Sequence, residues 1–306
     1  MIELIATAES VEQAEALLAV GIDTLYIGEE MFGLRLPTSF TKEEQRRIVE
    51  KAHQKGKKVT VALNGIMHPE KMKAVPDYLR FLKEIEVDQI TVGDPGVIFV
   101  IQRDAIELPY IYDGETLVTS SRQINFWAKR GAIGAVLARE VPFAEMQAMS
   151  EQLAVPAEVL VYGATCIHQS KRPLLQNYYN FTKNEESAAK ERGLFISEPK
   201  KEETHYSIYE DSHGTHIFAD NDVNLMEELL TLYEQGYTQW KLDGIYAPGE
   251  NFVEVAKHFV AAKQQLEAQT WTAAEAARRS RLIAALHPAN RGLDRGFFDL
   301  DPDEIK

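Results

Sequence analysis

Cysteine is almost missing from the sequence, because Cys166 is the only one among 306 residues. A single thiol excludes an internal disulfide and is typical of a protein of the reducing cytoplasm. Long apolar runs are missing too, since none approaches the roughly 20 residues that cross a bilayer. The amino-terminal segment also lacks a basic region followed by a signal-like apolar core. We therefore expect a cytoplasmic protein with no membrane segment.

Basic residues are few compared with acidic ones: 33 Lys and Arg against 47 Asp and Glu give a formal net charge of −14. A uniformly acidic surface repels phosphate backbones, which disfavours independent nucleic-acid binding. The exception is the tail, where five arginines between Ala277 and Gly296 accompany a single acid. Arg291 and Arg295 in the Gly-flanked loop are the candidate RNA contacts. The alternative is that the cluster packs on the barrel and pairs with surface carboxylates.

Familiar catalytic and metal-binding motifs are absent: the chain has no HExxH, GxSxG, Walker loop or CxxC. Its eight histidines show no metal-ligand spacing. His213 and His216 bracket a predicted hairpin turn, in which we expect them to be solvated. No metal site is predicted for this chain.

The chain consists mainly of short apolar runs, each followed by a helix-like segment. Alternating units of this kind predict parallel, right-handed βαβ connections. Eight such units match a (β/α)8 TIM-type barrel, which takes roughly 250 residues. An open doubly wound sheet is the rival, but no Gly-rich phosphate fingerprint follows the first strand. The predicted strands are Ile2 to Ala6, Thr24 to Gly28, Lys58 to Asn64, Gln89 to Gly93, Pro109 to Tyr112, Ala135 to Arg139, Ala157 to Gly163 and Gln239 to Ile245.

The predicted domain organisation is a barrel over residues 1–270 and a helix with a tail over 271–306. A polar insertion after strand seven, residues 164–215, interrupts the barrel and carries a hairpin. After it, Asn221 or Asp222 is expected to cap a helix that runs to Gln235.

Polar residues at the predicted strand ends are the candidates for a site, because barrel chemistry lies where the strands end. The seventh strand leads into Cys166, and a period of two places Glu158 and Tyr162 on one face, toward a shared interior. The sixth strand runs straight into Arg139 and Glu140. The candidate catalytic residues are Glu158, Tyr162, Cys166, Arg139 and Glu140.

A second set of polar residues, which follow strands or begin the helix after strand five, is expected to bind substrate at the same mouth. Asp113 and Asp243 also follow strands. Ordinary loop and cap chemistry is the alternative for each. For Cys166, the alternatives are a packed structural thiol and a nucleophilic pair with His168. The candidate substrate-binding residues are Arg35, Asn64, Asp94, Gln123, Asn125, Ser170 and Arg172.

Several ordered motifs cover about residues 1 to 182: Gly21-Ile22-Asp23, Tyr26-Ile27-Gly28, Phe32-Gly33-Leu34-Arg35, Lys58 to Asn64, Asp94-Pro95-Gly96, Gln123 to Trp127, Leu137 to Glu140 and Glu158 to Arg172. Together they resemble the collagenase-like peptidase family, as does the tail from Arg291 to Phe298. That family includes proteins for tRNA wobble-uridine hydroxylation and the ubiquinone-hydroxylation pair UbiU and UbiV. The chain is most similar to the shorter of two paired paralogues in Firmicutes.

The resemblance implies a barrel fold and a role in oxygen-independent hydroxylation, with prephenate as a required metabolite in the tRNA branch. The family's name implies proteolysis instead. Longer members carry HGxxCxxxSGRCLLS where this chain has Tyr162 in place of the histidine and Pro173 in place of the second cysteine. A cluster in the family's style needs four thiolates, so no cofactor is expected to be held by this chain alone.

Three functions remain open from the sequence. The first is a subunit of a system for prephenate-dependent 5-hydroxylation of wobble uridine. In this system a larger, cysteine-containing paralogue supplies the cluster, and the chain contacts tRNA through the complex. The second is a peptidase that uses Cys166 or a bound metal. The third is a non-catalytic barrel that binds a small carboxylate through Arg35, Arg139 or Arg172.

Overall fold

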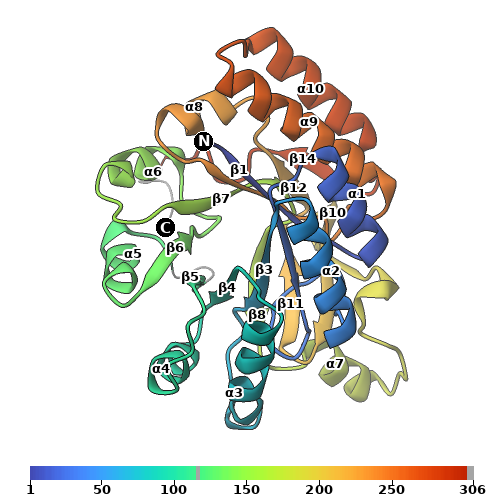
Figure 1. The fold of residues 1–306 in the computed structure, drawn as a ribbon. Coiled ribbons are helices and arrows are strands. Elements are labelled where there is room, and N and C mark those ends of the chain that lie inside the picture. Colours follow the sequence, from blue (N-terminus) through green and yellow to red (C-terminus); the bar gives the residue numbers. More distant parts are fainter. Residues whose placement is uncertain (115–117, 302–306) are drawn as a thin grey trace.

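Eight parallel strands close into a barrel in the computed structural model, which describes residues 1–114 and 118–301 (Figure 1). Neighbouring strands pair in chain order, and the last barrel strand pairs with both the first and the seventh, which closes the ring. The predicted TIM-type barrel is therefore confirmed. Its strands are β1 (Glu3–Thr7), β2 (Thr24–Gly28), β3 (Lys58–Leu63), β4 (Gln89–Val92), β5 (Tyr110–Tyr112), β6 (Ala132–Val136), β7 (Ala157–Gly163) and β13 (Gln239–Leu242).

Helices surround the barrel, and their ends follow the local chemistry of the sequence. Ser10 caps the first helix by accepting from the backbone N–H of Gln13. Thr41 and Glu44 form a reciprocal capping box at the second, which satisfies two backbone donors at the helix start. The barrel helices are α1 (Val11–Val20), α2 (Lys42–Gln54), α3 (Pro69–Glu84), α4 (Pro95–Arg103), α5 (Ser121–Ala128), α6 (Phe143–Ser150), α8 (Leu229–Glu234) and α9 (Glu250–Glu267).

The insertion after β7 folds as a separate antiparallel sheet in the order β8-β11-β10-β9. The predicted hairpin is present as β10 and β11, whereas the segment after Cys166, expected as a loop, is an edge strand paired with β11. The division at residues 164, 215 and 270 stays a prediction. The insertion contains β8 (Cys166–Ser170), α7 (Leu174–Thr182), the short 3-10 helix η2 (Lys190–Arg192), β9 (Phe195–Glu198), β10 (Lys201–Asp211) and β11 (Gly214–Phe218).

The predicted helix from Asn221 to Gln235 is wrong in its first half. Residues Asn221–Asn224 form β12, which pairs antiparallel with β7 and parallel with β14 (Gly292–Asp294). Two ladders therefore use the backbone groups that a helix would have bonded internally. The carboxylate of Asp222 binds Arg291 instead of capping a helix.

The carboxyl-terminal tail lies against the barrel. Helix α10 (Ala273–Leu286) packs on α9 (Figure 1). Beyond β14, the ring of Phe298 stacks on Phe143 with centroids 4.9 Å apart. Within the described ranges, no helix has both the length and the apolar character that a bilayer span requires.

Candidate active site

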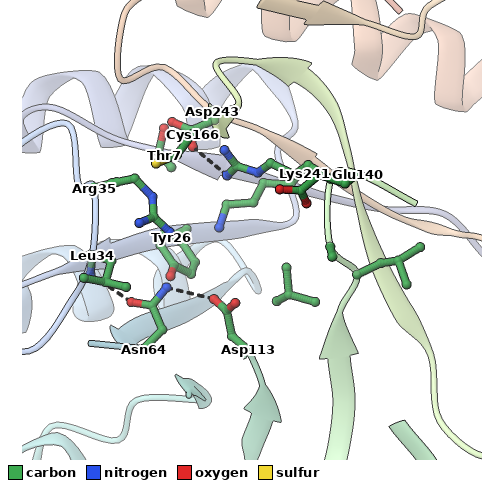
Figure 2. Close-up of a pocket in the computed structure, with 14 residues that line it drawn as sticks. Thr7, Tyr26, Leu34, Arg35, Asn64, Asp113, Glu140, Cys166, Lys241 and Asp243 are labelled. Carbon is green, nitrogen blue, oxygen red and sulfur yellow. Dashed lines mark hydrogen bonds and ion pairs between the residues drawn. The ribbon is translucent and has the colours of Figure 1, made fainter. Parts of the chain in front are cut away.

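A charged pocket lies at the carboxyl ends of the barrel strands (Figure 2). Strands β1, β2 and β13 contribute side chains from inside the barrel, and the segments after β2, β3, β5 and β6 supply most of the rim. The insertion adds Cys166 from β8. The pocket is lined by Thr7, Tyr26, Leu34, Arg35, Asn64, Asp113, Val136, Leu137, Ala138, Arg139, Glu140, Cys166, Lys241 and Asp243.

Lys241 is the most buried cation that lines this pocket and is only 5% exposed. Its Nζ lies 3.5 Å from Oε1 of Glu158 and 3.3 Å from the centre of the Tyr26 ring. Glu158 is 1% exposed, so burial raises the pKa of its carboxyl, and the charge of Lys241 offsets only part of that rise. The barrel interior thus contains an amine beside a carboxyl that is easily protonated.

Arg139 lies just past β6, which begins and ends three residues earlier than the sequence predicted. Its Nη1 donates to the carbonyl of Ala164 at 2.5 Å, and its Nη2 lies 3.4 Å from Oδ2 of Asp243. Asp243 comes close because Gly163, at φ 122°, lets the chain turn where a Cβ would stand 2.3 Å from the Asp243 carbonyl. The guanidinium is therefore held at the pocket wall.

Asn64 and Arg35 form another side of the pocket. Asn64 accepts from the backbone N–H of Leu34 and donates to Asp113, at 2.9 and 2.8 Å. Arg35 has a left-handed backbone (φ 51°), and its Nη1 donates to Gln169 of the insertion at 2.8 Å. This bond connects the barrel to the insertion above the pocket.

Cys166 lies beside a histidine, but not the one that its sequence neighbourhood suggested. The thiol donates to the backbone carbonyl of His168, whose side chain is exposed, at 3.3 Å. The nearby imidazole is that of His216, whose Nε2 is 2.9 Å from Oδ1 of Asp211. Burial alone would lower the pKa of His216, but hydrogen bonds with Asp211 and Cys166 raise it overall.

The expectation of solvated histidines is wrong, because His213 and His216 are both buried. His213 Nε2 bonds to the carbonyl of Glu30 at 2.6 Å. The insertion folds its hairpin turn against the loop after β2, which removes these rings from water. Among the described residues, no group of three or more His, Cys, Asp or Glu is placed to hold a metal ion.

Five of the proposed site residues line the pocket, namely Arg35, Asn64, Arg139, Glu140 and Cys166. Glu158 adjoins it through Lys241. Tyr162 does not share that interior: its hydroxyl bonds to His287 of α10 at 2.8 Å, and its ring lies by Phe252 of α9. The pairing of β7 with β13 shifts register between Leu160 and Tyr162, so the period of two fails there.

The other predicted substrate-binding residues lie outside this pocket. Asp94 caps α4 and accepts from Gly96. Gln123 and Asn125 bond to neighbouring backbone on and beside α5, at the outer surface. The backbone N–H of Arg172 donates to Ser170 at the end of β8. None of these residues is among those that line the pocket, and their role in substrate binding stays a prediction.

Arg291 is buried in the tail, which leaves its side chain little surface for the predicted RNA contact. It binds both carboxylate oxygens of Asp222, donates to Ser207 and lies over the ring of Tyr246. Arg295 is half exposed and pairs with Glu228 and Asp299, so its RNA contact stays a prediction.

Three charged residues of the pocket were not among the predicted site residues: Asp113, Lys241 and Asp243. The two aspartates follow strands, as the sequence shows. The signal for Lys241 is a lysine between two large apolar residues, Trp240 and Leu242, in the last barrel strand.

An eight-stranded parallel barrel with a charged pocket at its carboxyl end is a TIM-like α/β protein. A family model described as Peptidase family U32 matches residues 9–306, and the chain belongs to that family.

Two relatives from Bacillus subtilis (strain 168) are informative. tRNA hydroxylation protein P2 is 35% identical over an alignment of 306 residues that covers 97% of this chain and 97% of that protein. tRNA hydroxylation protein P1 is 27% identical over 248 residues, covering 79% of this chain and 58% of that protein. A solved U32 peptidase, Mk0906, has a TM-score of 0.47 at 18% identity, over 54% of this chain and 70% of that one.

Proposed function

We propose that this chain is a subunit of a bacterial system for prephenate-dependent 5-hydroxylation of wobble uridine in tRNA, working with a larger, cluster-bearing paralogue. The observation that carries the proposal is the likeness to tRNA hydroxylation protein P2, which extends over 97% of both chains. A tRNA substrate also agrees with the cytoplasmic location expected from the sequence.

The pocket supports a small, negatively charged metabolite as the ligand. Arg35, Arg139 and Lys241 all line it, and guanidinium groups recognise carboxylates through paired hydrogen bonds. Prephenate carries two carboxylates. We assign the prephenate site to this pocket, with Arg35 and Arg139 as the anchors.

A partner is proposed because the chain has one cysteine and a cluster of the family's type needs several thiolates. Two paralogues from one organism, P1 and P2, both match this chain. The larger one would supply the cluster and, given the acidity of this chain, most of the phosphate contacts.

Nucleoside analysis of tRNA from a deletion strain tests the proposal. We expect 5-hydroxyuridine derivatives at the wobble position to disappear on deletion and to return with the wild-type gene. Complementation with Arg139→Gln should fail, whereas Arg122→Gln, a matched change on the exposed side of α5, should restore the modification. Unchanged modification in the deletion strain would overturn the proposal.

Proteolysis is a second candidate, favoured by the placement of Cys166 beside the His216–Asp211 pair. A thiol, an imidazole and an orienting carboxylate are the groups that a cysteine nucleophile uses. Incubation of the purified chain with gelatin tests this activity. Cleavage that Cys166→Ser abolishes supports it, and absence of cleavage by the wild-type chain removes it.

A further inference from the structure

The pair formed by Lys241 and Glu158 is unusual for a barrel interior, because both groups are buried and one of them lines the pocket. A buried ion pair of this kind contributes little net stability, since desolvation of both charges opposes their attraction. The Nζ to Oε1 distance of 3.5 Å is also longer than a well-formed charged hydrogen bond. Stability alone is therefore a weak reason for this arrangement.

The carboxyl of Glu158 is placed to exchange a proton with Lys241, because its Oε1 lies 3.5 Å from Nζ. Burial raises the pKa of Glu158, which favours its protonated form. A neutral, desolvated lysine amine in a pocket is the form that attacks carbonyl carbon.

The position of the amine sets the class of carbonyl compound. In Figure 2, Lys241 extends toward Tyr26, and Arg35 reaches in from the opposite side. Arg139 lines the same pocket as Lys241. Because Arg35, Arg139 and Lys241 line one pocket, a carboxylate held by the arginines leaves the adjoining carbon, C2, in the same pocket as the amine.

We propose that Lys241 forms an imine with the C2 carbonyl of a small 2-oxo carboxylate bound in this pocket. The inference rests on the carboxylate-binding role proposed above and adds covalent chemistry to it.

The step balances without an oxidant or reductant. Glu158 takes one proton from the Lys241 ammonium, and the amine forms a C–N bond to C2 as the C=O π bond breaks. One N–H proton of the attached nitrogen passes to the oxygen, which becomes a hydroxyl. Glu158 then returns its proton to that hydroxyl, the C–O bond breaks, and water leaves. The product is a protonated imine beside the Glu158 carboxylate, which stabilises its positive charge.

Borohydride trapping with pyruvate tests the inference on the full chain. Borohydride reduces the imine to a stable secondary amine, and peptide mass spectrometry locates the added group. We expect labelling at Lys241 in the wild-type chain and its loss in Lys241→Arg, which keeps the charge but lacks a nucleophilic amine. Lys257→Arg, an exposed change on α9, should be labelled like the wild type. Glu158→Gln should slow labelling by about 10²-fold, because the proton acceptor is lost.

Calorimetric binding of lactate, which has the carboxylate but no carbonyl, separates this inference from the site on which it depends. Lactate binding with no pyruvate label on Lys241 overturns the imine and leaves the carboxylate site standing. Absence of both binding and label overturns both assignments for the pocket, while nucleoside analysis still judges tRNA hydroxylation independently. Absence of label on Lys241 in the wild-type chain contradicts the imine by itself, so the test does not depend on whether a variant folds.

Discussion

Replacing Arg291 by alanine should lower the free energy of unfolding, so its main effect is on the fold and not on RNA binding. Arg291 is 7% exposed, and its guanidinium bonds to Asp222, Ser207 and the carbonyl of Ala219. Its removal leaves the carboxylate of Asp222, which is 1% exposed, without this partner. Breaking a buried pair by deleting one member costs about 3–5 kcal/mol.

Arg295→Ala is the matched control from the same tail. Its partners are Glu228 and Asp299, and its side chain is half exposed. Such a surface pair contributes about 0–1 kcal/mol. The double variant Arg291→Ala with Asp222→Asn should regain part of the lost stability, because it removes the uncompensated charge.

Urea unfolding of the three variants and the wild type measures these free energies. The reasoning fails if Arg291→Ala unfolds at the wild-type urea concentration. It fails equally if Arg295→Ala is the more damaging of the two single changes.

Four further predictions concern Cys166, an iron–sulfur cluster, His213 and tRNA binding. Cys166→Ser should leave wobble-uridine hydroxylation in cells largely intact, and complete loss with the fold preserved would favour a nucleophile. The purified chain should remain colourless after anaerobic reconstitution, and stoichiometric iron and sulfide in a monomer would contradict this. Burial lowers the pKa of His213 to about 4, below its unfolded value. Its contribution to stability is therefore present above about pH 6.5 and is lost as pH falls toward 4. Urea unfolding across this range should show a smaller decline in the free energy of unfolding for His213→Gln than for the wild type. The chain should bind tRNA weakly alone and more strongly with the larger paralogue proposed as its partner. Arg295→Ala should reduce the slope of the salt dependence of tRNA binding by about one unit, whereas an unchanged slope would remove Arg295 as a phosphate contact.

The barrel was predictable because its information is local. Strand β2 has the predicted bounds, and the capping box at Thr41 needs only residues within one helical turn. Pocket residues that follow strands, such as Asn64 and Arg139, could be found because parallel strands gather their carboxyl ends at one face.

Interactions between distant segments were not predictable in the same way. Tyr162 changed faces because of a register shift against β13, which no pattern within β7 reveals. The strand at Asn221–Asn224 depends on β7 and on β14, some 70 residues later. His216 meets Cys166 only because β8 and β11 pair across the insertion.

Strand β14 pairs with β12 and covers its outer edge. Without it, β12 would present unpaired backbone N–H and C=O groups along its edge, and open edges of this kind recruit other chains. The strand that covers β12 is three residues long and ends in Asp294, so it offers little to pair with and repels a second acidic copy. A chain shortened before Gly292 should therefore self-associate, even where its barrel still closes.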